Sequence, residues 1–169
     1  MGRMGRVFDR RFARNWVSYT AQCILAAAAV LLTLVVLRQQ NLVMAVSLAG
    51  TVFTVFTVPH KVSASPRVFV GGHFIALAVG SLCVLIPAQS ALVQDAIFAL
   101  AVGCSMLLMA ITNTEHPPAA GTALGVVITE ASMRMVLGVA VGVGIRAVAH
   151  HLLKPLLRDL TPAADQSKP

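Results

Sequence analysis

Two stretches of this sequence concentrate the residues that could do chemistry. They are Ser63 to His73 (SASPRVFVGGH) and Thr114 to Leu124 (TEHPPAAGTAL). His116 in the second stretch can be neutral or protonated near pH 7, so it could add a charge to a site or carry a proton. Glycine lets backbone approach a ligand closely, and nearby hydroxyls can donate to it. These residue types suit a site for a small monovalent anion.

Helix N-termini are the expected means of holding that anion. A helix N-terminus carries roughly half a positive charge and free N–H donors, and therefore binds anions without a buried cation. We expect two half-helices that begin near Gly50 and Gly121 and point their N-termini at the middle of the membrane, with backbone N–H of Ala49 and Ala120 also available. The candidate binding residues are Ser47, Gly50, Thr51, Arg67, His73, Asn113, His116, Pro117, Pro118, Ala120, Gly121 and Thr122.

Structural roles compete with these functional ones. His116, beside Glu115, could cap the short helix that follows, and His73 could form a hydrogen bond between helices. Arg67 could be a selectivity cation at the inner mouth or a topology anchor. Arg146 lies inside the last apolar run, where it could extend its charge to the membrane surface or act in function.

Catalytic and metal sites are not expected. No nucleophile–base–acid set, phosphate loop or metal-ligand cluster can be assembled from the sequence. The acidic residues near the spans are Asp95, Glu115 and Glu130, and no two of them form a carboxylate pair. The three cysteines lie in apolar stretches without metal spacing. We therefore expect neither an enzyme nor a cofactor.

The elements that must position these residues are membrane helices. Of the 169 residues, 57% are apolar and 11% are charged, and the mean hydropathy is +0.83. A soluble domain carries about 25% charged residues, so most of this surface is not made for water. Apolar runs long enough to cross a bilayer are Val17 to Leu37, Leu42 to Val58, Val68 to Ile86, Ala96 to Thr112 and Met135 to Leu153.

A sixth segment, Asn113 to Thr129, is interrupted by prolines. The residues before Pro117 and Pro118 favour extended backbone, whereas proline is tolerated at the first helical position. The chain should therefore run extended from Asn113 and begin a helix near Pro118. We expect a similar interruption of Leu42 to Val58 around Ser47 and Gly50. The fold class is thus all-α: a polytopic bundle of five or six membrane segments, two of them discontinuous.

Basic residues set the expected orientation, since cytoplasmic loops carry an excess of Lys and Arg. With six passages and a cytoplasmic N-terminus, the inner side holds Arg3, Arg6, Arg10, Arg11, Arg14, Lys61, Arg67, Lys154, Arg158 and Lys168, and the outer side Arg38 and Arg134. If the proline-containing segment enters the membrane and leaves on the same side, the C-terminal basic residues lie outside, and the difference in Lys and Arg between the two sides becomes smaller. We expect a cytoplasmic segment 1–15, a transmembrane domain 16–153 and a cytoplasmic tail 154–169.

An internal repeat could relate the two halves. The sequence from Ala49 (AGTVFTVFT) lies over that from Ala120 (AGTALGVVI) at an offset of 71. Three matched residues are easily found in a chain rich in Ala, Gly and Val, so the repeat stays an open hypothesis. If real, it divides the chain into two inverted halves of three passages each, an arrangement that places transporter sites near the midplane.

The two motifs together resemble the HPP family of small integral membrane proteins. His116-Pro117-Pro118 matches the motif that names the family, and Pro66, Arg67, Gly71, Gly72 and His73 match its second pattern. The chain departs from the family patterns at Ala64, Ser65 and Val68, and has Ala120-Gly121-Thr122 where Gly-Ala-Thr is commoner. The resemblance implies a compact bundle usually described as four helices, sometimes fused to CBS domains, with plastid and cyanobacterial members linked to nitrite transport.

We therefore expect a permease or channel for nitrite or a similar small anion in a bacterial inner membrane. The alternative is a membrane scaffold or regulatory subunit that transports nothing. The expected partners are membrane lipids, a small inorganic anion and a second copy of the chain, with no nucleic acid.

Overall fold

The computed structural model describes residues 10–37 and 42–161, and within these ranges it contains helices and no strands. The elements are α1 (Arg10–Leu37), α2 (Leu42–Thr57), η1 (Val62–Ala64), α3 (Pro66–Val84), α4 (Ala91–Ile111), α5 (Pro117–Thr129), α6 (Met133–Leu153) and η2 (Lys154–Leu156). The all-helical expectation is confirmed. Arg3, Arg6, Arg38 and Lys168, and the greater part of segment 1–15, lie outside the described residues.

The helices fall into two length classes. The windows long and apolar enough to cross a membrane are Arg14–Val35, Pro66–Val84, Ala91–Ile111 and Met133–Leu156, in α1, α3, α4 and α6 with η2. Helices α2 and α5 are apolar but shorter. Two of the six α-helices of the described chain are therefore too short to count as spans by length, and a description with four helices would leave them out.

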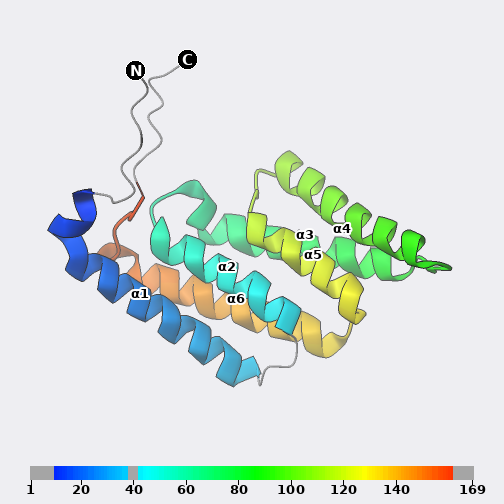
Figure 1. The fold of residues 1–169 in the computed structure, drawn as a ribbon, viewed down its shortest axis with the longest axis horizontal. Coiled ribbons are helices and arrows are strands. Elements are labelled where there is room, and N and C mark those ends of the chain that lie inside the picture. The colour runs from blue at the N-terminus through cyan, green and yellow to red at the C-terminus, as the bar shows by residue number, and fades with distance from the viewer. Residues whose placement is uncertain (1–9, 38–41, 162–169) are drawn as a thin grey trace, which may run out of the picture.

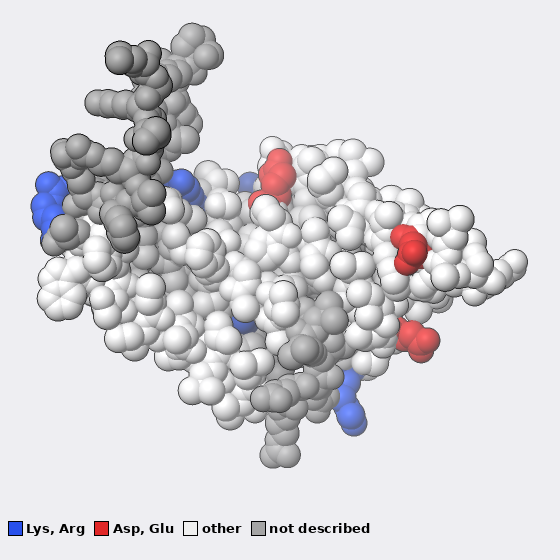
Figure 2. All heavy atoms as spheres, viewed as in Figure 1, with Lys and Arg blue, Asp and Glu red and all other residues white. Residues whose placement is uncertain are grey.

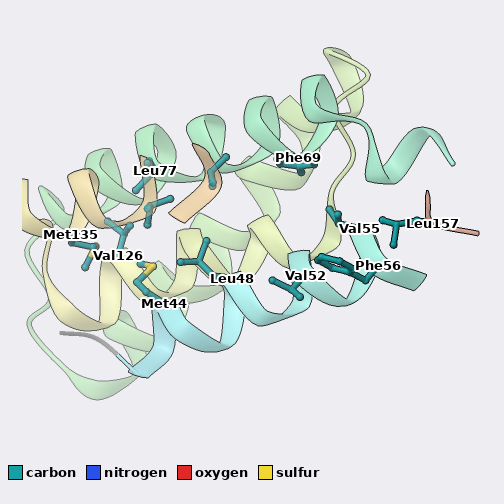
Figure 3. Close-up of a cluster of buried hydrophobic side chains, with 12 residues drawn as sticks. Met44, Leu48, Val52, Val55, Phe56, Phe69, Leu77, Val126, Met135 and Leu157 are labelled. Carbon is teal, nitrogen blue, oxygen red and sulfur yellow. The ribbon is translucent and has the colours of Figure 1, made fainter. Parts of the chain in front are cut away.

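Helix α3 is the centre of the bundle. Half of its span is buried, against 11% for α1, which lies at the periphery. Figure 1 shows α4 at one side of the bundle and α1 at the other, with α3 and α5 next to α4 and with α2 and α6 next to α1. One apolar core, which includes Leu48, Phe69 and Val139, joins the α2, α3 and α6 side (Figure 3). A second core, around Ala76, joins α3 to α4 and α5.

Glycines let α3 and α5 approach closely. A Cβ added at Gly80 would lie 2.8 Å from the carbonyl oxygen of Ala123 and 2.8 Å from Cβ of Val126. A Cβ at Gly72 would lie 3.0 Å from Cβ of His116. Without a large hydrophobic driving force in lipid, membrane helices depend on close packing of this kind. The Gly71-Gly72 pair therefore serves to admit the segment that precedes α5.

The expected interruption of α2 at Ser47 and Gly50 is wrong. The helix runs from Leu42 to Thr57 without a break. Its glycine serves packing instead, because a Cβ at Gly50 would lie 3.1 Å from Cβ of Pro118 on α5. A helix can keep a glycine in its interior at a cost of about 1 kcal/mol where a neighbour needs the space.

The expected start of α5 is confirmed within one residue. His116 has extended backbone (φ −131°, ψ 95°) and Pro117 is the first helical residue. The segment before it enters the bundle, since Thr114 lies against Gly71 and His116 against Gly72. His73, the next residue along α3, is seven residues from Pro66, or about 10 Å. Helix α5 therefore begins at depth rather than at the end of the bundle.

The first and last described segments meet at one end of the bundle. Gln22 in α1 donates from Nε2 to the carbonyl oxygens of Phe56 (2.6 Å) and Arg158 (2.9 Å), and its Oε1 accepts from the Arg158 N–H (3.0 Å). Tyr19 donates to the Leu160 carbonyl at 2.7 Å. Residues 157–161, which the sequence assigns to a tail, thus pack against α1 and the end of α2.

Charge is sparse on the helix surfaces, and the face in Figure 2 is largely uncharged. One end of the bundle carries most of the described Lys and Arg of the loops and helix ends. At this end α1 begins, α2 ends, α3 begins and α6 ends, and its basic residues are Arg14, Lys61, Arg67, Lys154 and Arg158. Arg134 lies at the other end, where α6 begins. Large exposed side chains such as Leu31, Phe53 and Leu107 are apolar, as lipid contact requires.

Candidate functional site

A buried hydrogen-bond network crosses the interior of the bundle between α2, α3 and the start of α5. Its five side chains are Ser47, Thr51, His73, His116 and Thr122, all of them candidate binding residues from the sequence. Each is at most 5% exposed. Residues from both halves of the chain, expected to converge, therefore do lie together.

Each histidine uses both of its ring nitrogens. His73 Nε2 lies 2.8 Å from Thr51 Oγ1, and His73 Nδ1 lies 2.8 Å from Thr122 Oγ1. His116 Nε2 lies 3.0 Å from the same Thr51 oxygen, and His116 Nδ1 lies 3.2 Å from the Ser63 carbonyl oxygen in η1. Thr51 thus connects the two imidazoles, whose ring centroids are 5.5 Å apart.

The far end of the network lies between α2 and α5. Ser47 Oγ is 2.7 Å from Thr122 Oγ1 and donates to the Pro118 carbonyl oxygen at 2.6 Å. Ser47 and Thr51 are four residues apart on α2, so both face the same side of that helix. Every buried polar side-chain atom of the described residues has a partner.

Arg146 is a functional candidate that was left out of the site predicted from the sequence. It lies in α6, is only 2% exposed, and donates from Nε to the Leu48 carbonyl oxygen (3.1 Å) and from Nη1 to the Gly142 carbonyl oxygen (2.5 Å). Leu48 is adjacent to Ser47 in α2, so Arg146 lies close to the helix that carries two residues of the network. The signal for it was present, because an ionisable residue inside a membrane span is a functional hypothesis by default.

No acidic side chain among the described residues neutralises Arg146. Asp95, Glu115 and Glu130 are exposed, and Asp159 pairs with His60 at 3.6 Å. The guanidinium interacts with carbonyl dipoles only, and its two recorded bonds leave part of its five-donor capacity unused. The interior therefore carries a net positive charge.

Other candidates lie outside the network. Arg67 is exposed and donates to the Thr112 carbonyl oxygen at 3.4 Å, which fits an anchor at the end of the bundle. Asn113 is exposed and takes positive φ (52°) in the turn after α4. Pro117 is exposed, while Pro118 contributes its carbonyl oxygen to Ser47.

The expected anion donors at helix N-termini are not available. Ala49 and Gly50 are interior residues of the unbroken α2, where each N–H bonds to the carbonyl four residues before it. In α5, Pro117 and Pro118 have no N–H, and the Ala119 N–H already donates to the His116 carbonyl oxygen at 2.8 Å. Ala120 and Gly121 follow these positions, so their N–H groups are also helix-internal. Gly121 instead packs against Ser47, 3.4 Å from the position of an added Cβ.

Comparison with known proteins places this geometry in a family. The family model described as "HPP, transmembrane region" matches residues 10–161, which is nearly the whole chain. A transmembrane protein of Dictyostelium discoideum is 37% identical over 78 residues, which is 46% of this chain and 27% of that relative. The chain thus spans well under two thirds of that relative's length. No solved structure matches the chain.

Proposed function

This chain belongs to the family of HPP transmembrane regions, and we propose that it conducts a small inorganic anion, such as nitrite, across a membrane through the interior of the bundle. The anion would remain chemically unchanged. The route needs one chain only, so an association of copies is a separate question from conduction.

The observation that carries the proposal is Arg146. A guanidinium buried at 2% exposure in a membrane helix is costly unless an opposite charge lies close to it. Acidic side chains are absent from its surroundings in the described chain. A diffusible anion supplies the missing charge, and a planar guanidinium matches a planar oxyanion such as nitrite in geometry.

A single guanidinium suits a site from which the anion can leave again. Leu48, whose carbonyl accepts from Arg146, is adjacent to Ser47 in α2, so this charge lies near the hydrogen-bond network. One cation binds an anion less tightly than two would, and conduction requires binding that is favourable but reversible. The buried charge thus comes from one arginine rather than from helix N-termini.

We also propose that the basic end of the bundle faces the cytoplasm of a bacterial cell. The described basic residues gather there, as the asymmetry of Lys and Arg between the two sides requires. The start of α1 and residues 157–161 would then lie on the inner side of the membrane.

A flux assay in proteoliposomes tests the proposal. Purified chain would be reconstituted and the entry of nitrite, nitrate, formate and chloride measured in turn, with protein-free liposomes to correct for diffusion of the neutral acids. We expect flux of at least one of these anions, reduced tenfold or more by Arg146→Gln and partly retained by Arg146→Lys. Arg134→Gln, at an exposed position at the other end of the bundle, is the matched control and should retain wild-type flux.

Folding must be checked beside flux, because a buried guanidinium also holds two carbonyl groups. Size-exclusion profile and helical content in detergent report it for each variant. The proposal would be overturned if the folded and reconstituted wild-type chain gave no flux of any of the four anions above that of protein-free liposomes. That result would favour the alternative of a scaffold or regulatory subunit.

A further inference from the structure

The buried network is a single line of hydrogen bonds with a carbonyl oxygen at each end. In order, it runs from the Pro118 carbonyl through Ser47, Thr122, His73, Thr51 and His116 to the Ser63 carbonyl. Its six contacts measure between 2.6 and 3.2 Å. Each distance is that of a made hydrogen bond, so each contact needs a hydrogen between its two atoms.

Counting hydrogens shows that the neutral network is one short. A hydroxyl has one hydrogen to donate, a neutral imidazole has one, and a carbonyl has none. The five side chains therefore supply five hydrogens for six contacts. In a fully neutral line, the two atoms of one contact therefore have no hydrogen between them, and their lone pairs face each other at hydrogen-bonding distance. Thr51 Oγ1 also lies 3.4 Å from the Ser47 carbonyl oxygen, which competes for the same hydrogen and does not add one.

One additional proton completes the line in two equivalent ways. If His73 is the imidazolium, it donates to both Thr122 and Thr51. Thr122 then donates to Ser47 and Thr51 to His116, and all six contacts are satisfied. If His116 carries the charge instead, it donates to Thr51 and to the Ser63 carbonyl, and Thr51 turns its hydrogen toward His73. All six contacts are again satisfied.

We propose that this line is a binding site for one proton, which is loaded together with the anion and moves between His73 and His116 through the Thr51 hydroxyl. The transfer is balanced: the His73 Nε2–H bond breaks as a proton passes to Thr51 Oγ1, while the former Thr51 hydrogen passes to His116 Nε2. No electron is transferred and no net atom is gained. This inference rests on the proposed function and adds proton coupling to it.

The charges around the line require the anion and the proton to arrive together. The titratable groups near it are its own two histidines and Arg146 of α6, which donates to the Leu48 carbonyl beside Ser47. Helix α2, η1 and the neighbouring Met109 of α4 contribute neutral groups. An imidazolium near an uncompensated guanidinium is unfavourable because two positive charges then share a poorly solvated interior. One bound anion offsets that repulsion, so the expected stoichiometry is one proton per anion.

Buffer-dependent calorimetry tests the coupling directly. Detergent-solubilised chain would be titrated with sodium nitrite and, separately, sodium nitrate in two buffers of the same pH and different ionisation enthalpy. The difference in heat gives the number of protons taken up per anion bound. We expect about one for the wild-type chain, the loss of most of that uptake in Thr51→Val, and its recovery in Thr51→Ser.

Thr54→Val is the matched control, because the Thr54 hydroxyl donates to the Gly50 carbonyl of its own helix at 3.1 Å and lies outside the line. Anion binding with equal heats in both buffers would overturn the proton site and leave anion conduction standing. Absence of binding, together with absence of flux in proteoliposomes, would overturn both. If Thr51→Val does not fold, the wild-type heats alone still decide the matter.

Discussion

Thr51 and Thr122 hold the two ring nitrogens of one histidine, each at 2.8 Å from His73. Thr51 is on α2 and Thr122 on α5, and both follow the dipeptide Ala-Gly. Their positions differ by the offset of 71 that relates the two halves of the sequence. The glycine before each threonine also packs against the other short helix, Gly50 on Pro118 and Gly121 on Ser47.

The order of helix lengths agrees with this pairing. Each half contains a long helix, a short one and a long one: α1, α2, α3 and then α4, α5, α6. The two short helices pack against each other where the network lies. The inverted repeat stays a prediction, and the equivalent environments of Thr51 and Thr122 are the feature that it would explain.

Removing the Thr122 hydroxyl should destabilise the bundle from the inside. Thr122→Val keeps the shape but leaves His73 Nδ1 and Ser47 Oγ each without one partner, and a buried unsatisfied polar group costs about 1–3 kcal/mol. Thermal unfolding in detergent, followed by circular dichroism, should show a lower midpoint. Thr129→Val is the control, because that hydroxyl bonds only within α5, to Gly125. Equal midpoints for the two variants would contradict a stabilising role for the network.

Gly80 should not tolerate even one added methyl group. In Gly80→Ala, the new Cβ would lie 2.8 Å from both the Ala123 carbonyl oxygen and Val126 Cβ, so α3 and α5 must separate. Overpacking of this kind costs about 1–3 kcal/mol. Gly144→Ala, which meets nothing within 4 Å, should be neutral or slightly stabilising. The same thermal assay compares the two, and a Gly80→Ala chain as stable as the Gly144→Ala chain would disprove the close α3–α5 contact.

Gln22 should control how firmly the C-terminal segment is held. Gln22→Leu removes the amide that exchanges three hydrogen bonds with Phe56 and Arg158. We expect a several-fold faster hydrogen exchange at 157–160, measured by mass spectrometry, with little change in α4. Gln94→Leu, on α4, is a control for the loss of an amide elsewhere. Unchanged exchange at 157–160 would mean that the contacts with Gln22 do not hold this segment.

Lys61 and Asp159 should be labelled from the same side of the membrane. The His60 N–H donates to Asp159 Oδ1 at 3.0 Å, and Lys61 Nζ lies 3.5 Å from Thr161 Oγ1, so both positions lie at one end of the bundle. Lys61→Cys and Asp159→Cys, in a background without the native cysteines, should react with an impermeant maleimide from one side. Gln89→Cys, between α3 and α4, should react only from the other. Labelling of all three from one side would refute the arrangement.

Much of the fold could be predicted because apolar length and proline chemistry act locally. The start of α5 follows from the restriction that Pro117 and Pro118 place on the residues before them. Charge alone does not give the bounds of α4, because the uncharged run begins at Ala96 whereas the helix begins at Ala91. Ser90 caps the helix by accepting from the Val93 N–H at 3.3 Å, and exposed Asp95 lies in the next turn. The sequence around Gly50 predicts a break in α2, whereas this glycine makes room for Pro118, a neighbour distant in sequence.

The sequence predicts which residues form the site better than it predicts how they are connected. Five hydroxyl and imidazole residues were identified by type and do converge. Their order along a hydrogen-bond line depends on how α2, α3 and α5 cross, which no local pattern contains. The place of Arg146 also depends on packing, because only the approach of Leu48 from α2 decides whether its charge stays inside or extends to the surface.

The contact between α1 and the last described residues has a consequence for biosynthesis. Gln22 is made well before the Arg158 groups that it bonds, because 136 residues separate the two positions in the sequence. Until then the Gln22 amide lacks its partners at Arg158 and has only the Phe56 carbonyl. A chain truncated before Arg158 should therefore insert normally but remain open at this end. Closure of this end of the bundle thus cannot occur until Arg158 has been made.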